Sequence, residues 1–382
     1  MARSSDILVI GGGVMGLWGA VKAAEAGLEV TLVEAGAIAS GASGGLLGAL
    51  FPWMPDRWND KKQFQFDSLV ALPAELAPLE TETGLSSGFR RNGRIIPLPK
   101  PHLREIAERH EREASVNWQQ GENRFFWHVS DVPPVENYLD PQFAAFGYIH
   151  DTLAARADPR KLTAVLRAWL ERQPNVTLLE NTALSAFDPK EGRAEIGGAA
   201  IGFSHAFVAA GVDSFPMLER LLPPLRKPLG QGVKGQAALL KADLDASLPV
   251  AFLDGLYIVP RENGHVAVGS TSENAYAEPF TTDALLDAVI EKARALVPAL
   301  RNALVLERWA GLRPKAIGRD PVVGPVPGHP NVIALTGGFK ISFGVAHRLA
   351  AAAVDHALGR DPKLPENFTL AGQLKRELGL AF

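Results

Sequence analysis

The sequence predicts an α/β protein (α+β overall) that combines a Rossmann-like domain with a second domain built on a mostly antiparallel β-sheet. Two observations predict the first domain: an apolar run, Ile7–Ile10, and the glycine pattern Gly11-x-Gly13-x-x-Gly16 that follows it directly. Strand-like alternation between residues 229 and 270 predicts the antiparallel sheet. At 382 residues the chain exceeds the size at which one hydrophobic core usually keeps growing, so two packed domains are expected.

The first β-α-β unit occupies residues 7–33. Ile7–Ile10 and Val30–Val33 both have the short apolar character of a buried parallel strand. Between them, apolar residues recur at the i, i+3, i+4 and i+7 positions of a helix, and Gly27 is placed to end that helix as a left-handed cap. These apolar residues are Leu17, Ala20, Val21 and Ala24. Two such strands joined by a helix predict the start of a parallel sheet.

The glycine pattern occupies the turn from strand to helix, which is the context that gives it physical meaning. Gly11 permits the tight turn, Gly13 lets the backbone approach a pyrophosphate, and Gly16 lets helix and strand pack closely. The start of the helix offers free N–H groups to phosphates. Glu34, at the end of the second strand, is placed to accept hydrogen bonds from an adenosine ribose and would repel a 2′-phosphate. The unit therefore predicts an adenine dinucleotide site that disfavours NADP.

The rest of the chain adds helices and strands to both domains. Helix-like segments between residues 59 and 112 alternate with a Gly/Arg-rich patch at 88–94 and a strand at 95–97. Asp158 is a suitable N-cap for an amphipathic helix, and Asn263-Gly264 favours a hairpin turn. The other expected elements are buried strands at Val176–Leu179, Phe207–Ala210 and Val332–Thr336, and helices at Leu162–Leu170, Leu285–Leu296 and Val345–Leu358, of which the last is the final helix and stops at Gly359.

The composition excludes several classes of function. A formal net charge of −3 lacks the basic excess that tight binding to a phosphate backbone needs, so no nucleic-acid partner is expected. The absence of cysteine excludes disulfides, cysteine nucleophiles and a cysteinyl link to a cofactor. The nine histidines include no pair at ligand spacing and no acidic cluster accompanies them, so no metal site is expected.

Membrane insertion and export are not expected either. Lys22, Glu25 and Glu29 interrupt the best candidate for a transmembrane segment. The N-terminus shows no charged-then-apolar leader with a small-residue cleavage site, so a cytoplasmic location is expected. The apolar segment 44–54 is interpreted as a buried loop, with contact to a membrane surface as the less favoured alternative.

Resemblance to a known family decides between FAD and NAD, which the glycine pattern alone does not. The stretch Asp6–Glu34 and the small-residue loop Ser40–Gly45 resemble the opening of the D-amino acid oxidase superfamily of flavin enzymes. Five further motifs occur in the order and spacing of glycine oxidase-like members, so the resemblance covers nearly the whole chain. They are Val-Lys-Gly-Gln at 233–236, Tyr-Ile-Val-Pro-Arg at 257–261, Val-Gly-Ser-Thr at 268–271, Trp-Ala-Gly-Leu-Arg-Pro at 309–314 and Leu-Thr-Gly-Gly-Phe-Lys at 335–340.

The resemblance implies FAD as the cofactor. The FAD is expected to be non-covalent, because the chain has no cysteine and no histidine between Val33 and Asp60. In the family, the small-residue loop wraps the pyrophosphate, and the N-terminus of a C-terminal helix points at the N1/O2 edge of the flavin. The FAD-binding residues that follow are Gly11, Gly13, Val14, Met15, Gly16, Glu34, Ala35, Ser40, Ser43, Gly44, Gly211, Gly337, Gly338, Lys340, Ile341 and Ser342.

The two expected domains are discontinuous in the chain. We expect an FAD-binding domain made of residues 1–84, 150–225 and 305–382. Residues 85–149 and 226–304 would then form the substrate-binding domain.

The resemblance also implies an enzyme, an FAD-dependent amine or amino-acid oxidase or dehydrogenase. Its substrate would be glycine, sarcosine or another N-substituted glycine, or a D-amino acid. Hydride would pass from the substrate carbon to flavin N5, and water would hydrolyse the resulting imine. The protein would have to orient the C–H bond, bind the carboxylate and keep the amine unprotonated.

Three residues are expected to act on the substrate. Arg313 matches the arginine that holds the substrate carboxylate in the family, and its planar guanidinium suits bidentate binding; the alternative is a structural ion pair. Tyr257 matches the tyrosine whose hydroxyl assists, or else is a core aromatic. Lys340 is a departure, because glycine oxidases have Gly-His-Phe-Arg where this chain has Gly338-Phe339-Lys340. Sarcosine oxidases have Gly-Phe-Lys there, with the lysine on the carboxylate, so a secondary amine remains open; the alternative is an exposed loop lysine.

Other functions remain open at this point. A 2-hydroxy acid oxidoreductase on the same fold would use Arg313 equally well. A flavin-binding subunit of a larger dehydrogenase complex is a second alternative, and a homo-oligomer is as open as such a complex. A tRNA-modifying amine oxidase is disfavoured because no basic domain or patch is found. Either oxygen or a quinone or other electron carrier would reoxidise the flavin, and Val266–Thr271 lacks the oxygen-activating lysine sought by analogy with sarcosine oxidase.

Overall fold

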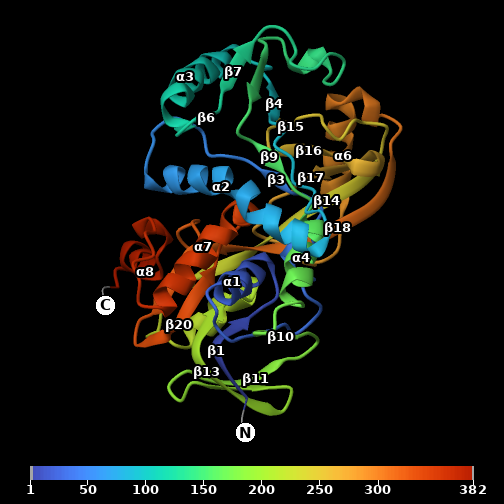
Figure 1. The fold of residues 1–382 in the computed structure, drawn as a ribbon. Coiled ribbons are helices and arrows are strands. Elements are labelled where there is room, and N and C mark those ends of the chain that lie inside the picture. The colour runs from blue at the N-terminus through green and yellow to red at the C-terminus, as the bar shows by residue number, and fades with distance from the viewer. Residues whose placement is uncertain (1–2, 381–382) are drawn as a thin grey trace.

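The first of two large β-sheets contains the glycine-rich turn. The computed structural model describes residues 3–380 and places them in two lobes, each organised around one sheet (Figure 1). Five neighbouring strands of the first sheet run parallel, in the order β10 (Val176–Leu179), β2 (Val30–Val33), β1 (Arg3–Ile10), β13 (Ala199–Val208) and β20 (His329–Thr336). Three antiparallel strands extend it, namely β11 (Leu184–Asp188), β12 (Arg193–Ile196) and β19 (Val322–Val326).

Helices cover both faces of this sheet. Successive side chains of a strand point to opposite faces. Accordingly, Ile7 and Val9 of β1 belong to one buried core, and Leu8 and Ile10 belong to another. The first core includes apolar side chains of α1 (Val14–Glu25), α2 (Asp60–Thr83), α4 (Pro159–Leu170) and α7 (Ser342–Ala357). The second includes those of α5 (Ser214–Glu219) and α8 (Leu370–Leu378).

Local signals in the sequence set the ends of these helices. The Asp158 side chain accepts hydrogen bonds from the N–H groups of Arg160 and Lys161, which caps α4. Asn59 caps α2 in the same way. Gly27 follows α1 with a positive φ of 78°, as the left-handed cap requires.

The second sheet is mostly antiparallel. Its eight strands have the order β18 (Leu304–Ala316), β14 (Gly230–Lys241), β17 (His265–Gly269), β16 (Leu256–Arg261), β15 (Val250–Leu253), β4 (Arg94–Pro97), β8 (Tyr148–Asp151) and β7 (Trp127–Ser130). Within the described part of this second sheet, only β15 and β4 pair in parallel. The turn at Glu262–Gly264, in which Asn263 has a φ of 62°, connects β16 and β17. Apolar residues of α6 (Ala284–Leu296) share a core with this sheet, and α3 (Pro101–Asn117) packs on β7.

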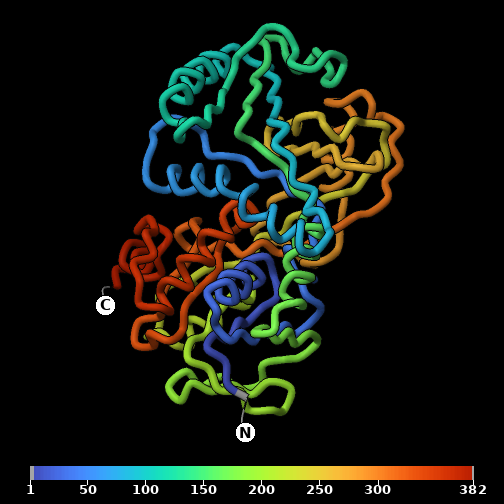
Figure 2. The backbone as a smooth tube through the Cα atoms, viewed as in Figure 1, coloured from blue at the N-terminus to red at the C-terminus, as the bar shows by residue number. Residues whose placement is uncertain are grey.

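Both lobes are assembled from separate parts of the chain. Figure 2 shows the first and last parts, in blue and red, in the lower lobe, whereas cyan, green, yellow and orange parts lie in the upper lobe. The two-stranded pair β3 (Ala49–Leu50) and β9 (Ala155–Arg156) brings residues near 50 beside residues near 155. A second short pair consists of β5 (Gln119–Gln120) and β6 (Asn123–Arg124).

The predicted fold class is confirmed, and two of its details are wrong. Val176–Leu179 forms a strand, but all four residues are half-buried, because β10 is an edge strand with a neighbour on one side only. The helix expected at Val345 begins three residues earlier, and it is not the last, since α8 follows it. The short amphipathic α8 adds one more apolar face to the second core.

Candidate functional site

A single large cavity joins the glycine-rich turn to the start of α7. Its volume is about 900 Å³. It lies beyond the carboxyl ends of β1, β13 and β20, which is where ligands bind in open parallel sheets. We call its two parts the glycine end, formed by Gly11, residues 13–15, Glu34 and residues 39–43, and the cationic end, formed by Arg94, Tyr257, Arg313 and residues 339–344.

At the glycine end, the absence of side chains lets strand, turn and helix approach one another. Gly11 has a φ of 108°, and its N–H donates to the carbonyl of Val33 at 2.8 Å. A Cβ on Gly16 would overlap the carbonyl oxygen of Gly11. The turn therefore excludes larger residues at both positions, as the glycine pattern predicts.

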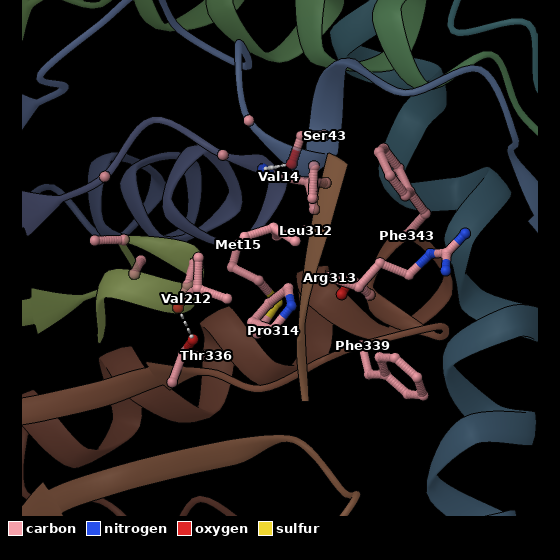
Figure 3. A pocket seen from close by; sticks show the side chains of 18 of the residues that line it. Val14, Met15, Ser43, Val212, Leu312, Arg313, Pro314, Thr336, Phe339 and Phe343 are labelled. Atoms are coloured by element: carbon pink, nitrogen blue, oxygen red, sulfur yellow. Dashed lines mark hydrogen bonds between the residues drawn. The ribbon is translucent and has the colours of Figure 1, made fainter. Parts of the chain in front are cut away.

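The first turn of α1 has N–H groups available for an anion. The Gly12 N–H donates to Glu34 at 2.7 Å, and the Val14 N–H donates to the Ser43 hydroxyl at 2.9 Å (Figure 3). The N–H groups of Gly13 and Met15 have no acceptor within residues 3–380. Unpaired N–H groups at the N-terminus of a twelve-residue helix fit a phosphate.

Glu34 and the loop after it complete this end. The Glu34 carboxylate also accepts from the Gly36 N–H at 2.8 Å, so two backbone groups fix its position. Ala35, Ser40 and Ser43 line the cavity. Gly44 does not, but a Cβ there would lie 2.5 Å from the Ala39 carbonyl oxygen, so this glycine permits the fold of the loop. Gly211, with a φ of 60°, lines the cavity where β13 ends.

Arg313 at the cationic end has no carboxylate partner. It extends from β18 and points between Phe339 and Phe343 (Figure 3). One terminal nitrogen, Nη1, donates to the Thr271 carbonyl at 3.2 Å. In the part of the chain that the structure describes, Arg313 forms no ion pair, so the structural ion pair considered from the sequence is not found.

Tyr257 and Lys340 line the same cavity. The Tyr257 hydroxyl has no hydrogen-bond partner among residues 3–380. Lys340 is exposed at the cavity, with its ammonium 5.6 Å from the centre of the Phe339 ring, and it too lacks an ion pair within the described residues. Two unpaired cations and an unpaired hydroxyl therefore face one space.

The surroundings shift the pKa of each of these three groups. Burial raises the pKa of Tyr257, against the opposing charges of Arg94 and Arg313, so the hydroxyl remains a donor near neutral pH. Although Lys340 is exposed at the cavity, partial desolvation of its ammonium, and then the charge of Arg313, lowers its pKa. Burial also lowers the pKa of Arg313, but a guanidinium stays protonated in proteins.

The loop from β20 to α7 contributes residues to the cationic end. Gly337 has a φ of 73°, and a Cβ on Gly338 would overlap the Ser342 hydroxyl, although neither glycine lines the cavity. Ile341 and Ser342 do line it, at the N-terminus of α7. The Thr336 hydroxyl donates to the Gly211 carbonyl at 3.1 Å, which ties this loop to the end of β13 (Figure 3).

Sequence reasoning missed an aromatic wall and a buried ion pair at the cationic end. The rings of Phe51, Phe252 and Tyr257 lie 5.0–5.6 Å apart and line the cavity. Arg94, buried in the protein, lies 4.3 Å from the Phe51 ring centre and donates to Asp151 at 2.8 Å. The apolar character of segment 44–54 was the one available signal, and residues 47–54 do line the cavity.

The structure thus brings most of the expected site residues to one cavity. Those that line it are Gly11, Gly13, Val14, Met15, Glu34, Ala35, Ser40, Ser43, Gly211, Tyr257, Arg313, Lys340, Ile341 and Ser342. The other four, Gly16, Gly44, Gly337 and Gly338, lie behind its surface. Within residues 3–380 there is no group of histidine, aspartate and glutamate side chains that could hold a metal ion. No helix in that range is long and apolar enough to cross a membrane.

Comparison with known proteins gives consistent matches over nearly the whole chain. The family model described as FAD dependent oxidoreductase matches residues 6–352. The chain is 29% identical to the glycine oxidases of Pseudomonas aeruginosa and Pseudomonas putida, over 97% of its own length and 100% of theirs. The crystal structure of glycine oxidase from Geobacillus kaustophilus is similar with a TM-score of 0.85 and 20% identity, covering 97% of this chain and 99% of that one. At that identity the similarity concerns the fold.

Proposed function

This chain belongs to the FAD-dependent oxidoreductase family, with FAD as its cofactor, and from that premise we propose that it oxidises the C–N bond of a small amine that carries a carboxylate. The candidates are glycine, sarcosine or another N-substituted glycine, and D-amino acids. The observation that supports this substrate class is the pair of cations, Arg313 and Lys340, that lack ion pairs within residues 3–380 and line the same cavity as the dinucleotide-binding turn.

The residues of the cavity fit FAD, which we propose is bound non-covalently. The unpaired N–H groups of Gly13 and Met15 suit a pyrophosphate, and the fixed carboxylate of Glu34 suits the adenosine ribose. The N-terminus of α7, at Ile341 and Ser342, would then lie at the flavin. The first sheet with its helices would form the core of the FAD-binding domain, and most of the second sheet would belong to the substrate-binding domain. Strand β18, which the expected bounds assign to the FAD-binding domain, pairs in the second sheet.

When bound, FAD supplies the two-electron acceptor for substrate oxidation. The protein's part is to bind and orient the substrate. The guanidinium of Arg313 can bind a carboxylate through two parallel N–H groups, and Lys340 adds a second charge. The Tyr257 hydroxyl, protonated because burial raises its pKa, can donate a further hydrogen bond.

The same cations also favour the reactive form of the amine. A positive charge close to an ammonium group disfavours its protonated state and lowers its pKa. Arg313 and Lys340 would act in this way on a substrate whose carboxylate they hold, because its amine is only one carbon away. The substrate would therefore bind with its nitrogen lone pair free, as oxidation of the C–N bond requires.

Anaerobic reduction of the FAD-loaded protein tests this proposal. The protein is mixed with glycine, sarcosine, larger N-substituted glycines, D-amino acids and 2-hydroxy acids, and the loss of flavin absorbance is followed. Reduction by at least one of the amino acids is expected. Methylamine is the matched control, since it has the amine without the carboxylate and should reduce the flavin far more slowly.

Two results would contradict the proposal. Reduction by hydroxy acids alone would show that the same carboxylate site serves C–O oxidation. Absence of reduction by every compound, in protein that retains FAD, would favour a flavin-binding subunit of a larger complex. Adding oxygen or a quinone to the reduced protein then identifies the electron acceptor.

A further inference from the structure

Gly235 lies in the Val-Lys-Gly-Gln motif, beside the side chain of Arg313. Strands β14 and β18 pair antiparallel, with Val233 opposite Arg313 and Gly235 opposite Gly311. Residues directly opposite each other, and those two positions further along, share one face of a sheet. A side chain at position 235 would therefore stand on the same face as Arg313, as its diagonal neighbour.

The guanidinium of Arg313 occupies the space that a side chain at position 235 would need. A Cβ built on Gly235 overlaps Cζ and both terminal nitrogens of Arg313. Gly311, which lies directly opposite Gly235 on β18, shows the same arrangement. A Cβ there would lie 2.5 Å from the ring of Trp309. Each glycine thus leaves a recess that a larger side chain from β18 fills.

The Thr271 carbonyl fixes one edge of the guanidinium in this recess. It accepts a hydrogen bond from Nη1 of Arg313 at 3.2 Å. Among the described residues, no other group accepts a hydrogen bond from the Arg313 side chain. The other N–H groups of Arg313 are left for a ligand in the cavity that this residue lines. Recess and carbonyl together determine which way these groups point.

Strand β14 cannot readily move away at this position, because a buried polar network holds it from the opposite face. Lys234 and Gln236, which flank Gly235, are 2% and 0% exposed. The Lys234 ammonium lies 3.0 Å from Asp283, and the Gln236 amide donates to Asp283 at 2.9 Å and to Glu273 at 3.0 Å. A substitution at Gly235 would therefore displace the flexible guanidinium and leave the pinned strand in place.

We propose that Gly235 is a positioning residue for the substrate carboxylate: its recess sets the orientation of Arg313, and through it the place where the carboxylate binds. This inference rests on the proposed function, because it takes Arg313 as the group that binds the carboxylate. The Val-Lys-Gly-Gln motif would then serve substrate binding, a role separate from holding the cofactor.

A double-mutant cycle tests whether Gly235 acts through Arg313. Four FAD-loaded proteins are titrated with acetate while the flavin absorbance is followed: the unchanged protein, Gly235→Ala, Arg313→Ala and the double variant. Gly235→Ala should weaken acetate binding at least about tenfold when Arg313 is present, and less than about twofold when Arg313 is already alanine. Gly202→Ala in β13 is the matched control, because its Cβ would lie at an ordinary 3.4 Å from Ser4 and should leave acetate binding unchanged.

The outcomes separate this inference from the proposed function. Two results would overturn the role of Gly235 and leave the proposed function standing. In the first, Arg313→Ala loses acetate binding but Gly235→Ala keeps it. In the second, Gly235→Ala weakens acetate binding equally whether position 313 is arginine or alanine. If Arg313→Ala binds acetate normally, the carboxylate site itself is wrong, and the role of Gly235 with it.

Should Gly235→Ala prove unstable, its thermal unfolding is compared with that of the double variant. Removal of the overlapping guanidinium should restore stability, and a double variant no more stable than Gly235→Ala overturns the inference.

Discussion

At the glycine end of the cavity the backbone makes the site, whereas at the cationic end side chains make it. The glycine end uses N–H groups of α1, one fixed carboxylate and glycines that allow close approach, nearly all within residues 11–44. The cationic end joins Arg94, Tyr257 and Arg313, which come from distant strands of the second sheet, to Lys340 in the loop that follows β20 of the first.

This difference indicates a division of labour. A backbone site tolerates few substitutions but requires no particular side-chain chemistry, and it suits a cofactor that stays constant. A side-chain site can change its specificity by single substitutions while the fold remains. We therefore expect changes at the glycine end to affect FAD retention and stability. Changes at Tyr257 and Arg313 of the cationic end should affect chiefly substrate affinity, whereas Ile341 and Ser342 of that end are expected at the flavin.

Gly16→Ala should produce the largest effect. Its Cβ would overlap the Gly11 carbonyl oxygen. This overlap can be relieved only by moving the backbone of Gly11 or Gly16, which would separate α1 from β1. A loss of about 3 kcal/mol in the free energy of unfolding is expected, at the upper end for overpacking, together with loss of FAD. Thermal unfolding and the flavin absorbance of the purified protein measure both.

Gly19→Ala provides the control in the same helix. Its Cβ would lie 3.0 Å from a Leu335 methyl group, a side-chain atom that has to shift by only a few tenths of an ångström, so FAD should be retained. If Gly16→Ala also kept its FAD, close packing at the turn would not be what holds the cofactor.

Arg313→Ala should give the next largest effect, at the opposite end of the cavity. Removing the partner of a buried, hydrogen-bonded charge costs about 2–5 kcal/mol of binding, which corresponds to at least about a thirtyfold loss in affinity for a carboxylate substrate. FAD content and thermal unfolding should stay close to those of the unchanged protein. Reduction kinetics over a range of substrate concentrations measure the affinity. A variant that lost its FAD would show that the two ends are not independent.

The contrast between the two ends also explains what the sequence could predict. Gly11, Gly16, the Gly27 cap and the Asn263 turn are local features, so their conformations followed from spacing and backbone preference. The ribose contact expected of Glu34 stays a prediction. The comparisons confirm the family and FAD, both of which were expected from the resemblance.

Features that depend on sheet order were not predictable in this way. Arg94 reaches the cavity because β4 pairs with β15, more than a hundred residues away in the chain. The half-buried state of Val176–Leu179 depends on which strand lies at the edge of the first sheet. The recess at Gly235 depends on the register between β14 and β18, and no local pattern encodes that register.

Ser43→Ala should have a moderate effect confined to the glycine end. It removes the acceptor for the Val14 N–H, which serves α1 as a helix cap does, and should cost about 1 kcal/mol in the free energy of unfolding. Ser43→Thr keeps the hydroxyl and is the matched control. Both variants should bind acetate with unchanged affinity. A loss of acetate binding in Ser43→Ala, with FAD retained, would contradict the division between the two ends.

The smallest effect is expected from Lys340→Arg, and it should appear only at alkaline pH. Partial desolvation and the charge of Arg313 lower the pKa of Lys340 below its ordinary value of 10.5. A carboxylate binds the protonated ammonium, so affinity should fall as pH rises through this lowered pKa, earlier than for an unperturbed lysine. The arginine variant stays protonated and should lose this pH dependence, whereas Lys340→Met should bind about tenfold more weakly at neutral pH and be insensitive to pH. Titration of the FAD-loaded proteins with acetate, which does not ionise in this range, measures the effect. An alkaline decline that survived in Lys340→Arg would assign the titration to another group and place Lys340 outside the carboxylate site.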